Sequence, residues 1–114
     1  MISFKHGDIV LVSLDSLKQK SPARYAVVIS SDVINDNLQT VIVCPLIEAK
    51  KVTKSRIGAT LIPKEVIGME ENCLALSLQL KSVAKERILK RVSSLPVDYM
   101  KQIKESVQAV LELD

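Results

Sequence analysis

Arg24 stands at the start of an apolar run, residues 25–30, whose β-branched side chains are typical of a buried strand. A guanidinium group donates two parallel hydrogen bonds, a geometry that suits a phosphate or a carboxylate. The alternative is a solvated residue at the end of a loop. Arg24 is therefore the first candidate for chemistry on a negatively charged ligand.

The other basic residues gather in three connections between predicted strands. Residues 49–64 contain no acidic residue at all. A basic loop is often simply solvated, but two such loops at the same end of a fold would suit a phosphate backbone or an acidic protein segment. The three groups are Lys18, Lys20 and Arg24; Lys50, Lys51, Lys54 and Arg56; and Lys81, Lys85, Arg87, Lys90 and Arg91.

Metal and thiol chemistry receive little support from the sequence. Cys44 and Cys73 both lie within apolar runs, so we expect two buried free thiols, with a disulfide or a metal site as the alternative. The single histidine, His6, is expected at the surface, with an acid or base role as its alternative. These residues lack the spacing of metal ligands, and the sequence predicts neither a metal nor another cofactor.

The composition predicts one small domain. The chain has 114 residues, a net charge of +3, 47% hydrophobic residues and 3% aromatic residues. So few aromatic side chains argue against binding of nucleic acid by stacked bases. We find no signal peptide and no apolar run long enough to span a membrane, which predicts a cytoplasmic protein with no membrane partner.

Short strands followed by one helix are predicted to position the candidate residues. From Pro96 onward, apolar residues recur at helical spacing, which predicts an amphipathic helix with Ser94 as its N-cap. Several short strands followed by one helix predict a mostly-β (α+β) fold, namely a small barrel capped by a C-terminal helix. The predicted strands are 8–14, 25–30, 39–46, 58–63, 73–78 with a continuation through 83, and 86–92 as a strand or helical turn; short helical turns are expected within 31–38 and 64–72.

The order of these segments resembles the MazF/PemK family, the toxin halves of bacterial type II toxin–antitoxin pairs. The resemblance rests on the opening Gly7-Asp8-Ile9, the second strand led by Arg24, and the late piece Q-x-K-S-V at residues 79–83. It extends over nearly the whole chain. It implies one domain over residues 1–114, an SH3-like β-barrel (CcdB/PemK-like) with a C-terminal helix, and a homodimer.

The same resemblance implies an activity. Active members of the family cut single-stranded RNA without a metal, by attack of a ribose 2′-hydroxyl on the adjacent phosphate. Arg24 aligns with the catalytic arginine of the family, and the groove is blocked by the acidic, disordered C-terminal segment of an antitoxin. The residues expected to contact RNA are Lys18, Lys20, Lys50, Lys51, Lys54, Arg56, Lys81 and Ser82, although turn capping is the alternative role for Ser82 and solvation for the loop residues.

Three positions depart from the family pattern. Tyr25 replaces the proline that usually follows the arginine, Ile47 replaces a threonine or serine after the third strand, and Leu78 replaces an acidic residue. Glu48 could act as a base or could repel RNA. Two functions are therefore carried forward: an endoribonuclease toxin, and a catalytically impaired binding module that holds an antitoxin, RNA or another protein in the same groove.

Overall fold

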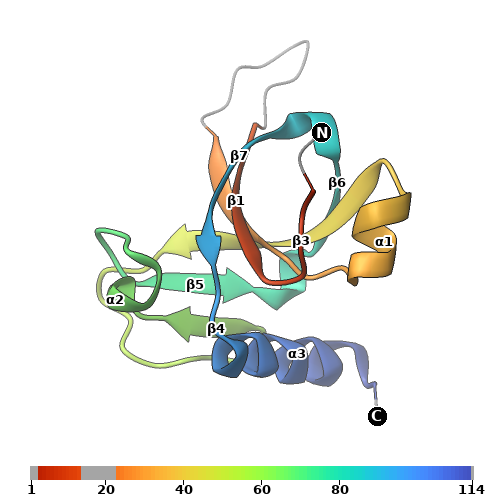
Figure 1. Ribbon diagram of the computed structural model, residues 1–114. Helices are drawn as coiled ribbons and strands as arrows, with labels where there is room; N and C mark the ends of the chain where they lie inside the picture. Colours follow the sequence, from red (N-terminus) through yellow and green to blue (C-terminus); the bar gives the residue numbers. More distant parts are fainter. Residues whose placement is uncertain (1–2, 14–22, 114) are drawn as a thin grey trace, which may run out of the picture.

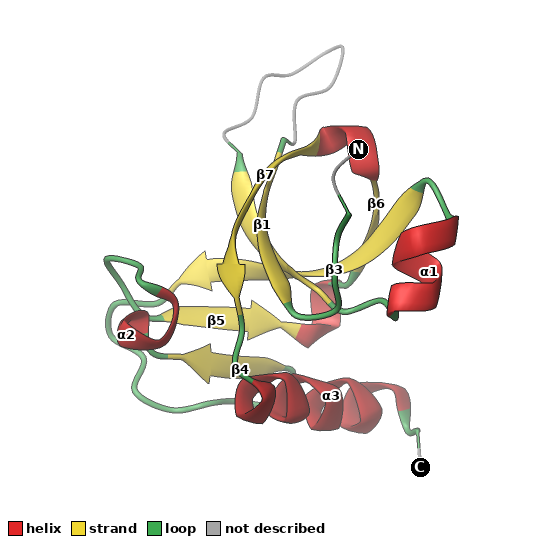
Figure 2. Ribbon diagram, viewed as in Figure 1, coloured by secondary structure: helices red, strands yellow, loops and turns green. Residues whose placement is uncertain are grey.

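A strongly curved antiparallel sheet and a long C-terminal helix dominate the computed structural model, which describes residues 3–13 and 23–113 (Figure 1). Figure 2 shows the helices at the periphery of the strands, with the C-terminal helix beside one end of the sheet. The strands in this part of the chain are β1 (Asp8–Val12), β2 (Arg24–Val28), β3 (Thr40–Glu48), β4 (Ala59–Ile62), β5 (Cys73–Leu76), β6 (Lys81–Ala84) and β7 (Ile88–Ser94). The helices are α1 (Asp32–Asn37), α2 (Lys64–Ile67) and α3 (Val97–Leu111), with short 3₁₀ turns η1 (Ser77–Gln79) and η2 (Lys85–Arg87).

The long strand β3 organises the sheet by pairing with three different strands along its length. Its first residues, 40–43, pair with β6, while residues 43–45 pair with β2 on the other side. From Leu46 onward β3 pairs with β5 instead. The strand order is therefore β4-β5-β3-β2-β1-β7, with β6 attached to β3.

This topology confirms the predicted mostly-β class with a C-terminal helix. Strands β1, β2, β6 and β7 and the start of β3 curl into a ring, and the end of β3 continues with β4 and β5 as a flatter layer beside α3 (Figure 1). Within the described residues the strand path stays open, because β4 and β7 at its two ends do not pair with each other.

The two faces of the curved sheet build two separate apolar clusters. Because side chains alternate across a strand, neighbours such as Ile9 and Val10 enter different clusters. Val10 joins the cluster inside the ring, together with Val28 and Val43. Ile9 joins the cluster on the other face, which Ile103 of α3 helps to cover. Both clusters consist mainly of aliphatic side chains, as the scarcity of aromatic residues requires.

Both cysteines belong to the cluster on the face that α3 covers. Cys44 and Cys73 are buried free thiols, as predicted. Burial raises the pKa of the Cys44 thiol to about 12. Burial, with a smaller contribution from the carboxylate of Glu48, also raises the pKa of Cys73. Burial and the raised pKa both disfavour the thiolate, which is the nucleophilic form of cysteine.

The predicted strand over residues 73–83 is divided in the structure. β5 ends at Leu76, the turn η1 follows, and β6 begins at Lys81. The division has a topological cause, since β5 pairs with the end of β3 whereas β6 pairs with its beginning. The chain must turn a corner between the two pairings. The short helical turns predicted within 31–38 and 64–72 are confirmed as α1 and α2.

The start of α3 differs from the prediction. Pro96 is the N-cap, and Ser94 is the last residue of β7, where its hydroxyl accepts a hydrogen bond from Arg91 at 2.7 Å. The predicted N-cap was therefore wrong, because Ser94 is used by the sheet. The apolar stripe of α3 is also shorter than predicted: Met100 and Ile103 are buried, but Val97 is 81% exposed.

Candidate functional site

A cleft of about 280 Å³ opens where β3 leaves β2 for β5. The last pair between β2 and β3 joins Ala26 to Pro45, and the next residue of β3, Leu46, already pairs with β5. The first residue of β2, Arg24, therefore has β1 beside it but no ladder partner on β3. The cleft follows directly from this change of partner.

The floor of the cleft is apolar. Val12, Ala26, Val43 and Val83 line it and belong to the cluster inside the ring. A low-polarity floor excludes water from one side of a bound group and strengthens electrostatic contacts made above it.

The polar side chains that line the cleft come from two segments far apart in sequence. Arg24 is the first residue of β2, whereas Gln79 ends η1 and Lys81 begins β6. Lys81 pairs with Val43, so its side chain shares the face of the sheet that carries the floor. In the part of the chain described, the side chains of Arg24, Gln79 and Lys81 make no hydrogen bond or ion pair, and all three are exposed. Two unpaired cations over an apolar floor are suited to an anion.

The positions that depart from the family pattern behave differently from one another. Ile47 lines the cleft and is 37% exposed, so an apolar side chain occupies its rim. Tyr25 contributes to the wall but also packs against the cluster that α3 covers. Leu78 does not line the cleft and covers Gly58 instead: a Cβ on Gly58 would lie 2.7 Å from Leu78 Cγ. Glu48 does not line the cleft. It lies at the end of β3, where it pairs with Cys73 of β5.

The predicted RNA-contacting residues separate into groups. Lys81 lines the cleft, whereas Ser82 follows it in β6 and therefore projects from the opposite face. Arg56 lines a second, shallower hollow of about 590 Å³ beside Glu105 of α3. Lys18 and Lys20 lie outside the described residues, so the structure does not place the first basic loop. The remaining predicted contacts are exposed in the loop between β3 and β4 and do not line the cleft: Lys50, Lys51 and Lys54.

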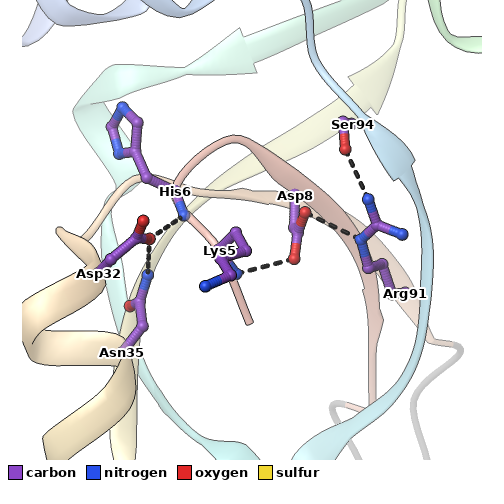
Figure 3. A network of polar contacts seen from close by, with 7 residues as sticks. All are labelled: Lys5, His6, Asp8, Asp32, Asn35, Arg91 and Ser94. Atoms are coloured by element: carbon purple, nitrogen blue, oxygen red, sulfur yellow. Dashed lines mark hydrogen bonds and ion pairs between the residues drawn. The ribbon is translucent and has the colours of Figure 1, made fainter. Parts of the chain in front are cut away.

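A network of polar contacts around one ion pair lies at the other end of β1 (Figure 3). Asp8 is only 2% exposed, and its carboxylate accepts hydrogen bonds from Arg91 Nε at 2.9 Å and from the Lys5 backbone N–H at 2.8 Å. Arg91 also donates to the hydroxyl of Ser94. Sequence reasoning used Asp8 only as part of the Gly7-Asp8-Ile9 opening and missed the ion pair. The available signal was an acidic residue that directly precedes a run of apolar strand residues.

His6 belongs to this same end of the molecule, far from Arg24 along β1 and β2. Its backbone N–H donates to Asp32 Oδ1 at 2.7 Å, and its ring Nδ1 lies 3.1 Å from the backbone oxygen of Ile29. The hydrogen bond from the His6 backbone is the main cause of the lowered pKa of Asp32. His6 is exposed, as predicted, and it does not line the cleft.

Over residues 3–13 and 23–113, no three or more His, Cys, Asp and Glu side chains are grouped so that they could hold a metal ion. In that same part of the chain, no helix has both the length and the apolar character needed to cross a membrane.

Comparison with known protein families gives one match that covers most of the chain. Residues 5–111 match the sequence model of a family described as the PemK-like, MazF-like toxin of type II toxin–antitoxin systems. Comparison with curated proteins gave no match. The family match covers β1 through α3, and so includes the cleft and the network of polar contacts around Asp8.

Solved structures share the fold at low sequence identity. A MazE–MazF complex from Deinococcus radiodurans superposes with a TM-score of 0.82 at 15% identity, covering 100% of both chains. A mycobacterial endoribonuclease in complex with its cognate antitoxin gives 0.78 at 11% identity, covering 100% of this chain and 98% of that one. The Mycobacterium tuberculosis toxin MazF-mt6 gives 0.75 at 16% identity, covering 94% and 98%. At these identities the likeness establishes the fold alone.

Proposed function

Because the chain belongs to the PemK-like, MazF-like toxin family of type II toxin–antitoxin systems, we propose that it is an endoribonuclease that cleaves single-stranded RNA in the cytoplasm without a metal ion. The observation that supports this proposal most directly is the cleft itself. Arg24 and Lys81 bring to one apolar-floored opening two cations that have no hydrogen bond or ion pair with the described residues. A phosphodiester carries the negative charge that this arrangement suits.

The proposed reaction is an attack of a ribose 2′-oxygen on the adjacent phosphorus. The bond to the 5′-oxygen of the next nucleotide breaks, which leaves a cyclic phosphate and a 5′-hydroxyl. Negative charge gathers on the phosphoryl oxygens in the transition state, and a guanidinium stabilises that charge with two hydrogen bonds. Arg24 has this role, and Gln79 is a neutral donor at the same opening.

The proposed partners follow from the same cleft. An acidic peptide segment would compete with RNA for Arg24 and Lys81, so the inhibitor is an antitoxin with a negatively charged C-terminal segment. The fold shared with the mycobacterial endoribonuclease that is in complex with its cognate antitoxin supports this proposal. A homodimer is also proposed. Sedimentation at micromolar protein should give twice the mass of the chain, and a stable monomer would contradict it.

A second function has a specific observation in its favour. The apolar side chain of Ile47 occupies the rim of the cleft, and no carboxylate is among the lining residues that the structure describes. Such a cleft can bind an anion without cleaving it. The alternative is therefore a binding module that holds RNA or an acidic protein segment in the same cleft.

One assay separates the two functions. Diverse single-stranded RNAs are incubated with micromolar protein in the presence of EDTA, and the new ends are mapped. The endoribonuclease should produce cyclic phosphates and 5′-hydroxyls, and Arg24→Ala should lose this activity while Lys104→Ala, on the exposed face of α3, keeps it. Wild-type protein that binds these RNAs and leaves them intact would support the binding module instead.

A further inference from the structure

The proposed cleavage has a requirement that Arg24 does not meet. The 5′-oxygen leaves as an alkoxide unless a proton reaches it, and a positioned acid accelerates such a step by roughly 10²–10⁴-fold. The residues that line the cleft and carry a dissociable proton on their side chains are Arg24, Tyr25 and Lys81. Neither a carboxylate nor an imidazole lines the cleft among the described residues.

Two of these three side chains are poor donors here. A guanidinium keeps its proton in proteins, so Arg24 contributes charge and hydrogen bonds rather than a proton. Tyr25 follows Arg24 in β2 and so projects from the other face of the strand, where it packs against the cluster that contains Ile9 and Val27. Its ring is used mainly for packing.

Lys81 has the position and the chemistry that remain. β3 separates β6 from β2, so Lys81 and Arg24 approach the cleft from opposite sides of β3. The Lys81 side chain is exposed and has no hydrogen bond or ion pair with the described residues. An ammonium group on a long stem carries its proton at neutral pH and, unlike a guanidinium, can transfer it.

From this geometry we infer that Lys81 is the general acid of the reaction, an inference that rests on the proposed endoribonuclease function. Hydroxide from water removes the proton of the 2′-hydroxyl, and the 2′-oxygen forms its bond to phosphorus. The bond between phosphorus and the 5′-oxygen breaks as Lys81 Nζ gives its proton to that oxygen. The neutral amine then takes a proton from water, which restores the hydroxide and the ammonium.

The test compares two RNA substrates that differ at one atom. In the second substrate, sulfur replaces the 5′-oxygen at the scissile bond, and a thiolate leaves without needing a proton. Lys81→Met and Lys81→Arg should each lower cleavage of the oxygen substrate about 100-fold or more. Both variants should cleave the sulfur substrate within about threefold of wild type. Arg24→Ala should be slow on both substrates, and Lys104→Met should match wild type on both.

The Lys81→Arg variant distinguishes proton transfer from charge alone, because arginine keeps the positive charge but not the transferable proton. Normal cleavage of the oxygen substrate by Lys81→Arg would overturn the inference and leave the proposed function intact. The inference is also wrong if the sulfur substrate fails to restore cleavage by either variant. Wild-type protein that cleaves neither substrate would overturn the inference together with the endoribonuclease function. Urea unfolding of each variant verifies that the exposed substitution leaves the fold intact.

Discussion

The two ends of the β1–β2 pair differ in whether their charged side chains have partners. At the end that holds Asp8, an acid and Arg91 form an ion pair at 2.9 Å, with further hydrogen bonds around it (Figure 3). At the end that holds Arg24, the side chains of Arg24 and Lys81 have no such partner among the described residues. Paired charges specify how the chain folds, and unpaired charges remain available to a ligand. We call these ends the paired end and the cleft end.

The paired end extends from β1 into α1 through buried polar groups. The hydroxyl of Ser30 donates a hydrogen bond to Asn35 Oδ1 and accepts one from the Ile42 backbone N–H at 3.0 Å. Asn35 in turn donates to the Ser30 backbone oxygen at 3.0 Å, and its own backbone oxygen accepts from Lys85 Nζ. Both Ser30 and Asn35 are buried, so their polar atoms need these partners. Two of these contacts link α1 or the turn before it to distant parts of the chain, Ser30 to β3 and Asn35 to Lys85, whereas the Arg24 side chain makes no hydrogen bond or ion pair with the described residues.

The largest effect is expected from substitution of Arg24, which should lower RNA cleavage and leave the stability of the fold almost unchanged. Arg24→Met should lower RNA cleavage about 10²–10³-fold, because the transition state loses a charged donor. The free energy of unfolding should change by less than about 0.5 kcal/mol, since the side chain is exposed and has no hydrogen bond or ion pair with residues 3–13 and 23–113. Cleavage rates and urea unfolding measure the two quantities. A large loss of stability in Arg24→Met would mean that Arg24 stabilises the fold, as Arg91 does.

Arg91→Met at the paired end should give the opposite result. It leaves the carboxylate of Asp8, which is 2% exposed, without its cationic partner. Breaking a buried pair from one side is strongly destabilising, and solvent around the half-exposed Arg91 reduces the cost to about 2–3 kcal/mol. Urea unfolding at neutral pH measures it. If Arg91→Met keeps the stability of the wild type but loses RNA cleavage, Arg91 serves the reaction rather than the fold.

Gly58 lines the second hollow rather than the cleft, and it is covered by Leu78, which lies in the turn that leads to Gln79. Gly58 has φ +77, and an added Cβ would lie 2.7 Å from Leu78 Cγ. Gly58→Ala should cost about 2 kcal/mol in unfolding free energy, from the positive φ and the displaced leucine together. Gly68 has φ +67 with nothing within 4 Å of a Cβ, so Gly68→Ala should cost only about 1 kcal/mol.

A double variant isolates the contribution of the leucine. In a Leu78→Ala background, Gly58→Ala should cost no more than Gly68→Ala does in the wild type. The position of Gly58 matters to the site because its backbone oxygen accepts from the Ser77 N–H at 2.8 Å, in the same turn that carries Gln79. If Gly58→Ala costs as much unfolding free energy in the Leu78→Ala background as in the wild type, contact with Leu78 is not the cause of that cost.

Ile47 provides a test by gain of function. Ile47→Thr adds a hydroxyl at the rim of the cleft, and a hydrogen bond to a charged phosphate contributes about 1.5 kcal/mol. Cleavage should therefore rise about tenfold in the RNA assay. The matched control is Ile47→Val, which keeps the branched shape without the hydroxyl and should leave the rate unchanged. Equal gains from both variants would attribute the effect to space rather than hydrogen bonding.

The smallest effect is expected from Asp32, which is fully exposed at the paired end. Its pKa lies below the ordinary value of 3.8, mainly because the His6 backbone N–H donates to it. A lowered folded-state pKa contributes stability above the ordinary value, and this contribution is lost as the pH falls through the lowered one. Asp32→Asn should therefore show a smaller loss of stability between pH 7 and pH 3 than wild type. Identical pH dependence in urea unfolding would contradict this assignment.

Much of the fold was predictable because it depends on local patterns. Runs of β-branched residues marked the strands, and the three- and four-residue spacing after Pro96 marked α3. The division of residues 73–83 into β5 and β6 was not predictable in the same way. It arises because those strands pair with different parts of β3, which no local pattern records. The N-cap at Ser94 failed for a related reason, since Arg91 of the sheet uses that hydroxyl.

The order and type of the residues were enough to predict a mostly-β fold with an arginine at the start of its second strand. Strand propensity and the type of each side chain are local properties, so they can be read without a fold. Which charges are paired depends on how the strands come together in three dimensions. Asp8 and Arg91 are 83 residues apart, and Arg24 and Lys81 reach one cleft because β3 changes its partner. Such encounters depend on strand register, which is set by packing of the whole chain.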